Sequence, residues 1–164
     1  MLGFTVTDPI RPLYIVELGA TSYQLGFIMA LPSIVSLFFR VPVSMVSDRF
    51  GGWRLMLCSI AISVFTTSIF AFIHDLIWFF PVVSLAALSW SVFSPISMAI
   101  VANQSTSNIQ GTTMGMYLTS IGAAMFVGPL LSSLLTISIE FRKIFLLSTI
   151  FPLAALVIFL FIRL

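Results

Sequence analysis

Five runs of almost uninterrupted apolar side chains constrain this chain more than any other feature. They cover residues 25–46, 55–73, 76–102, 114–137 and 144–162. An α-helix needs about 20 apolar residues to cross the hydrocarbon core of a bilayer. The runs are too long and too uniform for the alternating strands of a membrane β-barrel. Backbone groups in lipid must also bond within the protein, so we expect an all-α membrane protein.

The composition excludes the main soluble classes. Hydrophobic residues make up 60% of the chain and charged residues only 7%, where a soluble domain has roughly 25% charged residues. Cys58 is the single cysteine and cannot form a disulfide within the chain. The net charge of +2 is too small for a nucleic-acid-binding surface. We therefore expect a multi-pass protein of the cell membrane whose partners include the lipid bilayer and no nucleic acid.

The first 18 residues indicate a sixth span that is incomplete. They are apolar at their edges but contain Asp8, Pro9, Arg11 and Pro12. They lack the basic start, apolar stretch and cleavage site of a secretory signal. As a helix they would reach roughly 27 Å, which is barely enough to cross. The sequence thus predicts one domain over residues 1–164, a six-helix transmembrane bundle whose first helix, residues 1–18, is truncated.

Polar breaks at 47–54, 74–75, 103–110 and 138–143 join the spans into helical hairpins. With the first break inside the cell, the inner side holds three of the flanking cations and the outer side two. The inner ones are Arg49, Arg54 and Arg163, and the outer ones are Arg142 and Lys143. This margin is too small to set the orientation by charge alone. We expect His74 to be a solvated residue of an outer turn.

The stretch 44–54 reads Ser-Met-Val-Ser-Asp-Arg-Phe-Gly-Gly-Trp-Arg and follows the second span. It resembles the signature loop of the major facilitator superfamily. Asp48, Arg49, Gly51 and Arg54 match that motif, whereas Ser44 replaces a Gly and Trp53 replaces a basic residue. Residues 9–20 resemble the family's first helix and outer turn, and 141–145 resemble the start of its sixth helix. The resemblance covers nearly the whole chain and implies the N-terminal half of a transporter, with this loop in the cytoplasm.

Two roles remain open for the loop. The resemblance implies that it is a gate that locks the two transporter halves in the outward-facing conformation. Alternatively, its charges only fix the topology, since Arg49 and Arg54 lie at headgroup level and can meet anionic lipid. From the residues themselves, Gly51 predicts a turn with positive φ. Asp48 lies near the start of the third span, where the helix dipole favours a carboxylate.

Small residues recur at intervals of four along the fifth span. They are Ser120, Ala124, Gly128 and Ser132. Such ladders let helix backbones approach closely. The segment resembles the family's antiporter motif at Gly115, Gly128 and Pro129, although Ala124, Ser132 and Ser133 stand where the motif has Gly. The resemblance implies drug or solute efflux by proton antiport, and a plain packing face is the alternative.

Two charges fall inside the predicted first helix. Asp8 lies eleven residues before Gly19, which we take as the outer surface, and so roughly 16 Å deep. Arg11 is three residues further on and shares its helix face. One interpretation is that the two charges only neutralise each other. Because an intramembrane charge is a functional-site candidate, the other interpretation is that Asp8 takes up and releases a coupling proton.

Arg40 is the third intramembrane charge, about 12 Å from the cytoplasmic end of the second span. It shares a face with Ser36 and Ser44. It could hold an anionic substrate, pair with an acid, or extend its head to the membrane surface. The family's usual Arg near the start of the fourth helix has no counterpart, because no Arg lies between Arg54 and Arg142.

No Gly-rich Lys-Ser/Thr loop, no Cys/His cluster and no Ser–His–Asp set can be assembled, so we predict neither a cofactor nor an enzyme. We predict a secondary active transporter of the major facilitator type that exports a solute or drug in exchange for protons. Its partners would be a small-molecule substrate and a second six-helix half, on the same or a separate chain. The alternative is a truncated, non-transporting membrane fragment or a half-transporter that needs a partner half.

Overall fold

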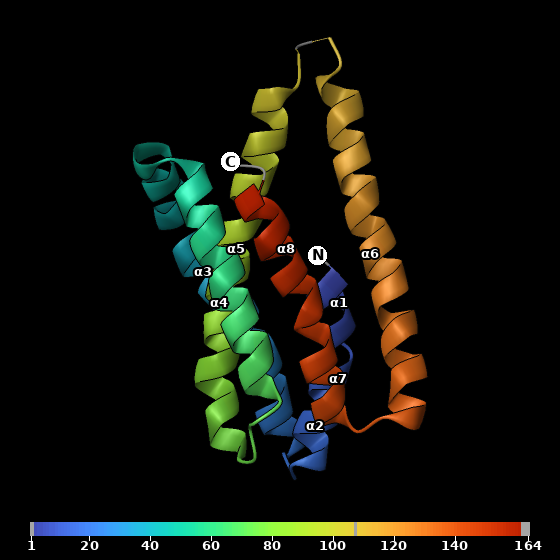
Figure 1. The fold of residues 1–164 in the computed structure, drawn as a ribbon. Helices are drawn as coiled ribbons and strands as arrows, with labels where there is room; N and C mark the ends of the chain where they lie inside the picture. Colours follow the sequence, from blue (N-terminus) through green and yellow to red (C-terminus); the bar gives the residue numbers. More distant parts are fainter. Residues whose placement is uncertain (1, 107, 162–164) are drawn as a thin grey trace.

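The computed structural model describes residues 2–106 and 108–161, and these form helices joined by short connections (Figure 1). The helices are α1 (Leu2–Thr7), α2 (Ile10–Glu17), α3 (Ser22–Phe50), α4 (Gly52–Phe70), η1 (Leu76–Trp78), α5 (Phe79–Gln104), α6 (Gln110–Ser138), α7 (Phe141–Ser148) and α8 (Ile150–Phe161). No strand occurs among the described residues. Five segments are long and apolar enough to cross a membrane: Ser22–Ser47, Gly52–Phe70, Leu76–Gln104, Gln110–Ile137 and Phe141–Phe161. The predicted all-α membrane architecture is confirmed for these five spans.

The N-terminal segment differs from the single truncated helix predicted over residues 1–18. It forms two short helices, α1 and α2, which are interrupted at Asp8 and Pro9. The interruption has a local cause, because Pro12 has no N–H to donate to the carbonyl of Asp8. The segment ends in a turn at Gly19, whose φ of 84° favours glycine.

The predicted break at 47–54 is far shorter than expected. Helix α3 begins with a capping box between Thr21 and Gln24 and continues to Phe50, and α4 begins at Gly52. Gly51 alone makes the turn, with φ at 84°, so the predicted positive φ is confirmed. Asp48 consequently lies in the last turn of α3 rather than at the start of the next span. The expected stabilisation by the N-terminus of the next span stays a prediction, because the side chain of Asp48 lies outside the described residues.

Helix α5 packs against both α3 and α4, and α1 packs against α6, α7 and α8. Helix α4 also contacts α7 and α8, which joins these helices into one bundle. Hydroxyl groups link α5 to its neighbours, with Ser36 and Ser91 joined at 2.9 Å and the Ser89 hydroxyl donating to the Ser59 carbonyl at 2.7 Å. Aromatic rings form the core near one end of the bundle. They belong to Tyr14, Phe70, Phe79 and Phe145.

The connections gather at two opposite ends of the bundle (Figure 1). The Gly51 turn and the connection between α5 and α6 lie at one end. Helix α2, the connection 71–78 and the connection between α6 and α7 lie at the other. This alternation is the hairpin arrangement predicted from the polar breaks. Helices α7 and α8 form one span with an interruption at Thr149, three residues before Pro152.

Candidate functional site

A cavity of about 390 Å³ opens beside α1 and α2. Its walls come from α1, α2, α3 and α5, with Met125 contributed by α6. Most of the lining is apolar or aromatic, including Phe4, Met29 and Trp90. Asp8 and Arg11 also line it and are its charged residues. Apolar cavities with a few convergent polar groups are typical of small-molecule sites.

Asp8 and Arg11 form an ion pair at the wall of this cavity. Arg11 Nη1 lies 3.1 Å from Asp8 Oδ1. The Arg11 side chain is only 10% exposed, whereas that of Asp8 is 62% exposed. The guanidinium also donates to Thr7 Oγ1 at 3.3 Å and lies 5.0 Å from the ring centre of Phe70. The carboxylate of Asp8 is therefore accessible from the cavity, whereas the guanidinium of Arg11 is mostly buried beside it.

Arg40 is not brought to this site. Its side chain is exposed and makes no ion pair or hydrogen bond within the described part of the chain. Its nearest link to the cavity is Ser36, one helical turn earlier, which lines the wall. Of the three predicted intramembrane charges, the structure joins Asp8 and Arg11 and leaves Arg40 separate.

The gating-loop residues lie together at the Gly51 end of the bundle. Arg49, Gly51 and Arg54 are exposed. The side chain of Asp48 lies outside the described residues, and so does Arg163. Gly52 was missed by the motif comparison, although a Cβ there would come within 3.0 Å of Ile96 Cγ2. The doubled glycine at 51–52 is the sequence signal that could have revealed this close approach of α4 to α5.

The small-residue ladder of α6 packs along only part of its length. A Cβ added to Gly128 would lie 2.6 Å from Thr5 Cβ, so this glycine brings α6 directly against α1. Ala124 and Ser132 are also buried. Gly115 has open space around it, and Ser120 is exposed. Pro129 lies within the continuous helix α6. Gly128 therefore has a structural role in this packing.

A hydrogen-bonded cluster lies at the end of the bundle opposite the Gly51 turn (Figure 1), and the sequence did not predict it. The Tyr14 hydroxyl donates to the Ile73 carbonyl at 2.6 Å and accepts from Arg142 Nε at 3.2 Å. Arg142 Nη1 donates to His74 Nε2 at 3.0 Å, and His74 Nδ1 lies 2.6 Å from the Phe72 carbonyl. His74 is exposed, as expected of a turn residue, but it also ties α7 to the α4–α5 connection. The residues are far apart in sequence, so no local pattern could have revealed the cluster.

Comparison with known proteins agrees with this architecture. The sequence profile described as Major Facilitator Superfamily matches residues 1–164. An uncharacterized MFS-type transporter of Methanocaldococcus jannaschii is 23% identical over 82% of this chain and 35% of its own length. The multi-drug resistance efflux pump PmrA of Streptococcus pneumoniae is 26% identical over 98% of this chain and 41% of its own length.

The chain thus spans well under half the length of the relatives it matches. The match nevertheless covers the paired charges, the gating loop and the small-residue ladder. Together with five membrane-spanning helices, it makes this chain a multi-pass protein of the cell membrane. The chain belongs to the major facilitator superfamily.

Proposed function

We propose that this chain forms the N-terminal half of a secondary transporter that exports a small solute or drug in exchange for protons. The observation that carries the proposal is the cavity wall, where an exposed Asp8 carboxylate is held by a buried Arg11. The family and the similarity to a multi-drug resistance efflux pump support it.

The ion pair of Asp8 and Arg11 is suited to proton exchange at the carboxylate. Asp8 is open to the cavity, so water or substrate can reach its carboxylate. Arg11 is held by Thr7 and Phe70 as well as by the carboxylate. Substrate and proton would compete for the same carboxylate, which couples binding of one to release of the other. Arg40 and the gating residues Asp48, Arg49, Gly51 and Arg54 would act outside this cavity, in substrate access and closure.

The family binds substrate between two six-helix halves near the bilayer midplane. This chain supplies five spans and the broken segment α1–α2, which we propose as the sixth. A second half would close the cavity, either on the same chain or on a separate one. The alternative function is a membrane fragment, or a half-transporter that is inactive until its partner half binds.

The test is proton-coupled flux in proteoliposomes, followed with a pH-sensitive dye while cationic drugs and small acids are added. We expect substrate-dependent proton movement that is lost in Asp8→Asn. Glu17→Gln is the matched control, because Glu17 is an exposed carboxylate of α2 that does not line this cavity. Activity only on co-expression with a second half would establish the half-transporter. Flux that persists in Asp8→Asn would contradict the assigned role of Asp8.

A further inference from the structure

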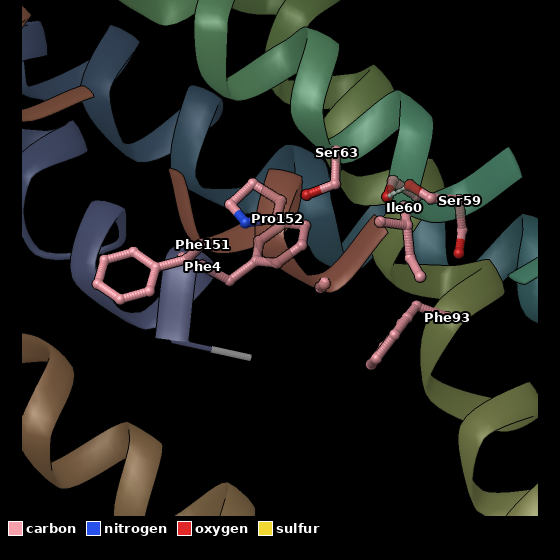
Figure 2. A pocket seen from close by; sticks show the side chains of 10 residues that line it. Phe4, Ser59, Ile60, Ser63, Phe93, Phe151 and Pro152 are labelled. Carbon is pink, nitrogen blue, oxygen red and sulfur yellow. Dashed lines mark hydrogen bonds between the residues drawn. The ribbon is translucent and has the colours of Figure 1, made fainter. Parts of the chain in front are cut away.

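A second, smaller cavity of about 60 Å³ lies among α1, α4, α5 and α8 (Figure 2). Three serines line it from α4 and α5, namely Ser59, Ser63 and Ser89. Apolar side chains close its other sides, among them Phe4, Phe93 and Pro152. The cavity is therefore polar on one wall and apolar on the rest.

The hydroxyl of one of these serines makes no hydrogen bond in the part of the chain that the structure describes. Ser59 Oγ donates to the Met56 carbonyl at 2.8 Å, and Ser89 Oγ donates to the Ser59 carbonyl at 2.7 Å. That carbonyl is the usual partner of a helical serine four residues later, which here is Ser63. Ser63 is only 5% exposed, and its hydroxyl makes no hydrogen bond within the described residues. In Figure 2 this hydroxyl points toward Pro152 across the cavity. The Ser63 oxygen is not among the fully buried side-chain atoms without a partner, so it is accessible and can pair with a polar group that enters the cavity.

Phe4 connects the small cavity to the large one, because it lines both. Its ring lies 5.2 Å from that of Trp90, which lines the large cavity, and Trp90 stacks at 6.0 Å on Phe93, which lines the small one. These three rings form an aromatic row between the two cavities.

The backbone of α1 has little room to move and open this row. A Cβ on Gly3 would lie 3.0 Å from Pro152 Cδ, so α1 is already in close contact with α8. On its other side, Thr5 is pressed against Gly128 of α6. Rotation of the Phe4 side chain is the movement that could join the cavities while both close approaches are kept.

We propose that the small cavity is a second binding subsite of the transporter, reached when Phe4 rotates. It would take a short apolar segment of the substrate that ends in a hydrogen-bonding group, such as a hydroxyl or carbonyl, which pairs with Ser63. This proposal rests on the proposed function, since it requires the large cavity to bind the exported solute.

The test uses a protein whose remaining tryptophan is Trp90, obtained with Trp53→Phe and Trp78→Phe and reconstituted in lipid nanodiscs. Long and short ω-bromoalkanols are the probes, because bromine quenches the fluorescence of a tryptophan it approaches. Bromoalkanes of matched length lack the hydroxyl. We expect Ser63→Ala to weaken binding of the long bromoalkanol about threefold to tenfold, the size expected for one hydrogen bond. Binding of the bromoalkane should not change.

Ser68→Ala is the matched control, because Ser68 also lies on α4 but its hydroxyl donates to the Val64 carbonyl and lines neither cavity. A second variant, Ala155→Leu, fills the small cavity without removing the serine. It should reduce affinity for long bromoalkanols and spare short ones. Equal effects of Ser63→Ala on the alcohol and the alkane, or no effect of either variant, would overturn the subsite.

Binding and flux separate this proposal from the proposed function. If flux depends on Asp8 but binding of the long bromoalkanol does not depend on Ser63, the proposed transport function is supported and the subsite is refuted. If binding of the long bromoalkanol depends on Ser63 but a complete transporter moves no protons, the proposed proton exchange is refuted and the binding site with two cavities is supported.

Discussion

Arg11 is buried and Asp8 is exposed, so the two members of this ion pair depend on each other unequally. Without Arg11, Asp8 would still be solvated by the cavity. Without Asp8, the guanidinium would remain buried with no counter-charge, and an uncompensated buried charge is strongly destabilising. Their spacing predicted the pairing, because residues three apart share a helix face. The unequal burial was not predictable, since it depends on Phe70 of α4, which is distant in sequence.

This asymmetry predicts the stability of two variants. Asp8→Asn should lower the free energy of unfolding by about 1–2 kcal/mol, less than for a fully buried pair because Asp8 is exposed. Adding Arg11→Met should restore part of the loss, since the unpaired charge is then gone. Thermal unfolding in detergent measures both. A double variant that is less stable than Asp8→Asn alone would show that Arg11 stabilises the fold by contacts other than the ion pair.

The contact between Arg142 and His74 predicts the effect of one substitution at the end of the bundle that holds α2. Arg142 can only donate, so His74 Nε2 is the acceptor in this contact. His74→Ala removes this acceptor and should lower the free energy of unfolding by roughly 0.5 kcal/mol, a small effect because the ring is exposed.

His74→Gln is the control for this effect, since an amide oxygen can also accept from Arg142. The midpoint of thermal unfolding should be lower in His74→Ala than in His74→Gln. Equal midpoints of the two variants would show that the contact adds nothing to stability.

Among the helices, hydropathy predicted the spans well and their ends poorly. Five apolar runs became five membrane-spanning segments, because a helix is the structure that satisfies a lipid-exposed backbone. The end of α3 was misplaced because Asp48 and Arg49 suggested a loop, whereas Gly51 makes the turn alone. The break between α1 and α2 was also missed, although Pro9 and Pro12 were visible. Length and apolarity define a span, but single residues decide where it bends or ends.

The contact between α1 and α6 predicts opposite effects for two glycines of one helix. Gly128→Ala should destabilise the protein by about 1–3 kcal/mol, the usual penalty for overpacking, because the new methyl group meets Thr5. Gly115→Ala should be neutral or stabilising by up to about 1 kcal/mol, because its surroundings are open and alanine favours the helix. Thermal unfolding of the two variants in the same detergent tests the contact. Equal stability of the two would mean that α6 is not seated on α1.

At the scale of the whole molecule, the connections divide between two ends, and the family implies which end is cytoplasmic. Charge alone could not decide, because the inner and outer ends carry similar numbers of cations. The candidate site also emerges only at this scale. Asp8 and Arg11 were found from sequence, but the cavity around them is assembled from four other segments, and its subsite depends on α8. Such long-range contacts leave no local pattern.

Cysteine accessibility tests the orientation. In a Cys58→Ser background, Glu140→Cys should react with a membrane-impermeant maleimide in intact cells, because the α6–α7 connection is assigned to the outside. Thr106→Cys, in the connection between α5 and α6, should react only after the membrane is permeabilised. Both positions are exposed, so access to the reagent depends on the side of the membrane. The reverse labelling pattern would show that the chain has the opposite orientation in the membrane.

The interruption between α1 and α2 gives the molecule a mechanical joint at its charged site. Helix α1 packs closely between α6 and α8, while α2 is held to the α4–α5 connection by the hydrogen bond from Tyr14 to the Ile73 carbonyl. Asp8 lies in the interruption and Arg11 in the first turn of α2, so their ion pair braces the joint. The brace holds only while the carboxylate is charged. In a proton exchanger, the arriving proton would thus do more than displace a substrate: it would also release the contact that holds the start of α2 to the interruption.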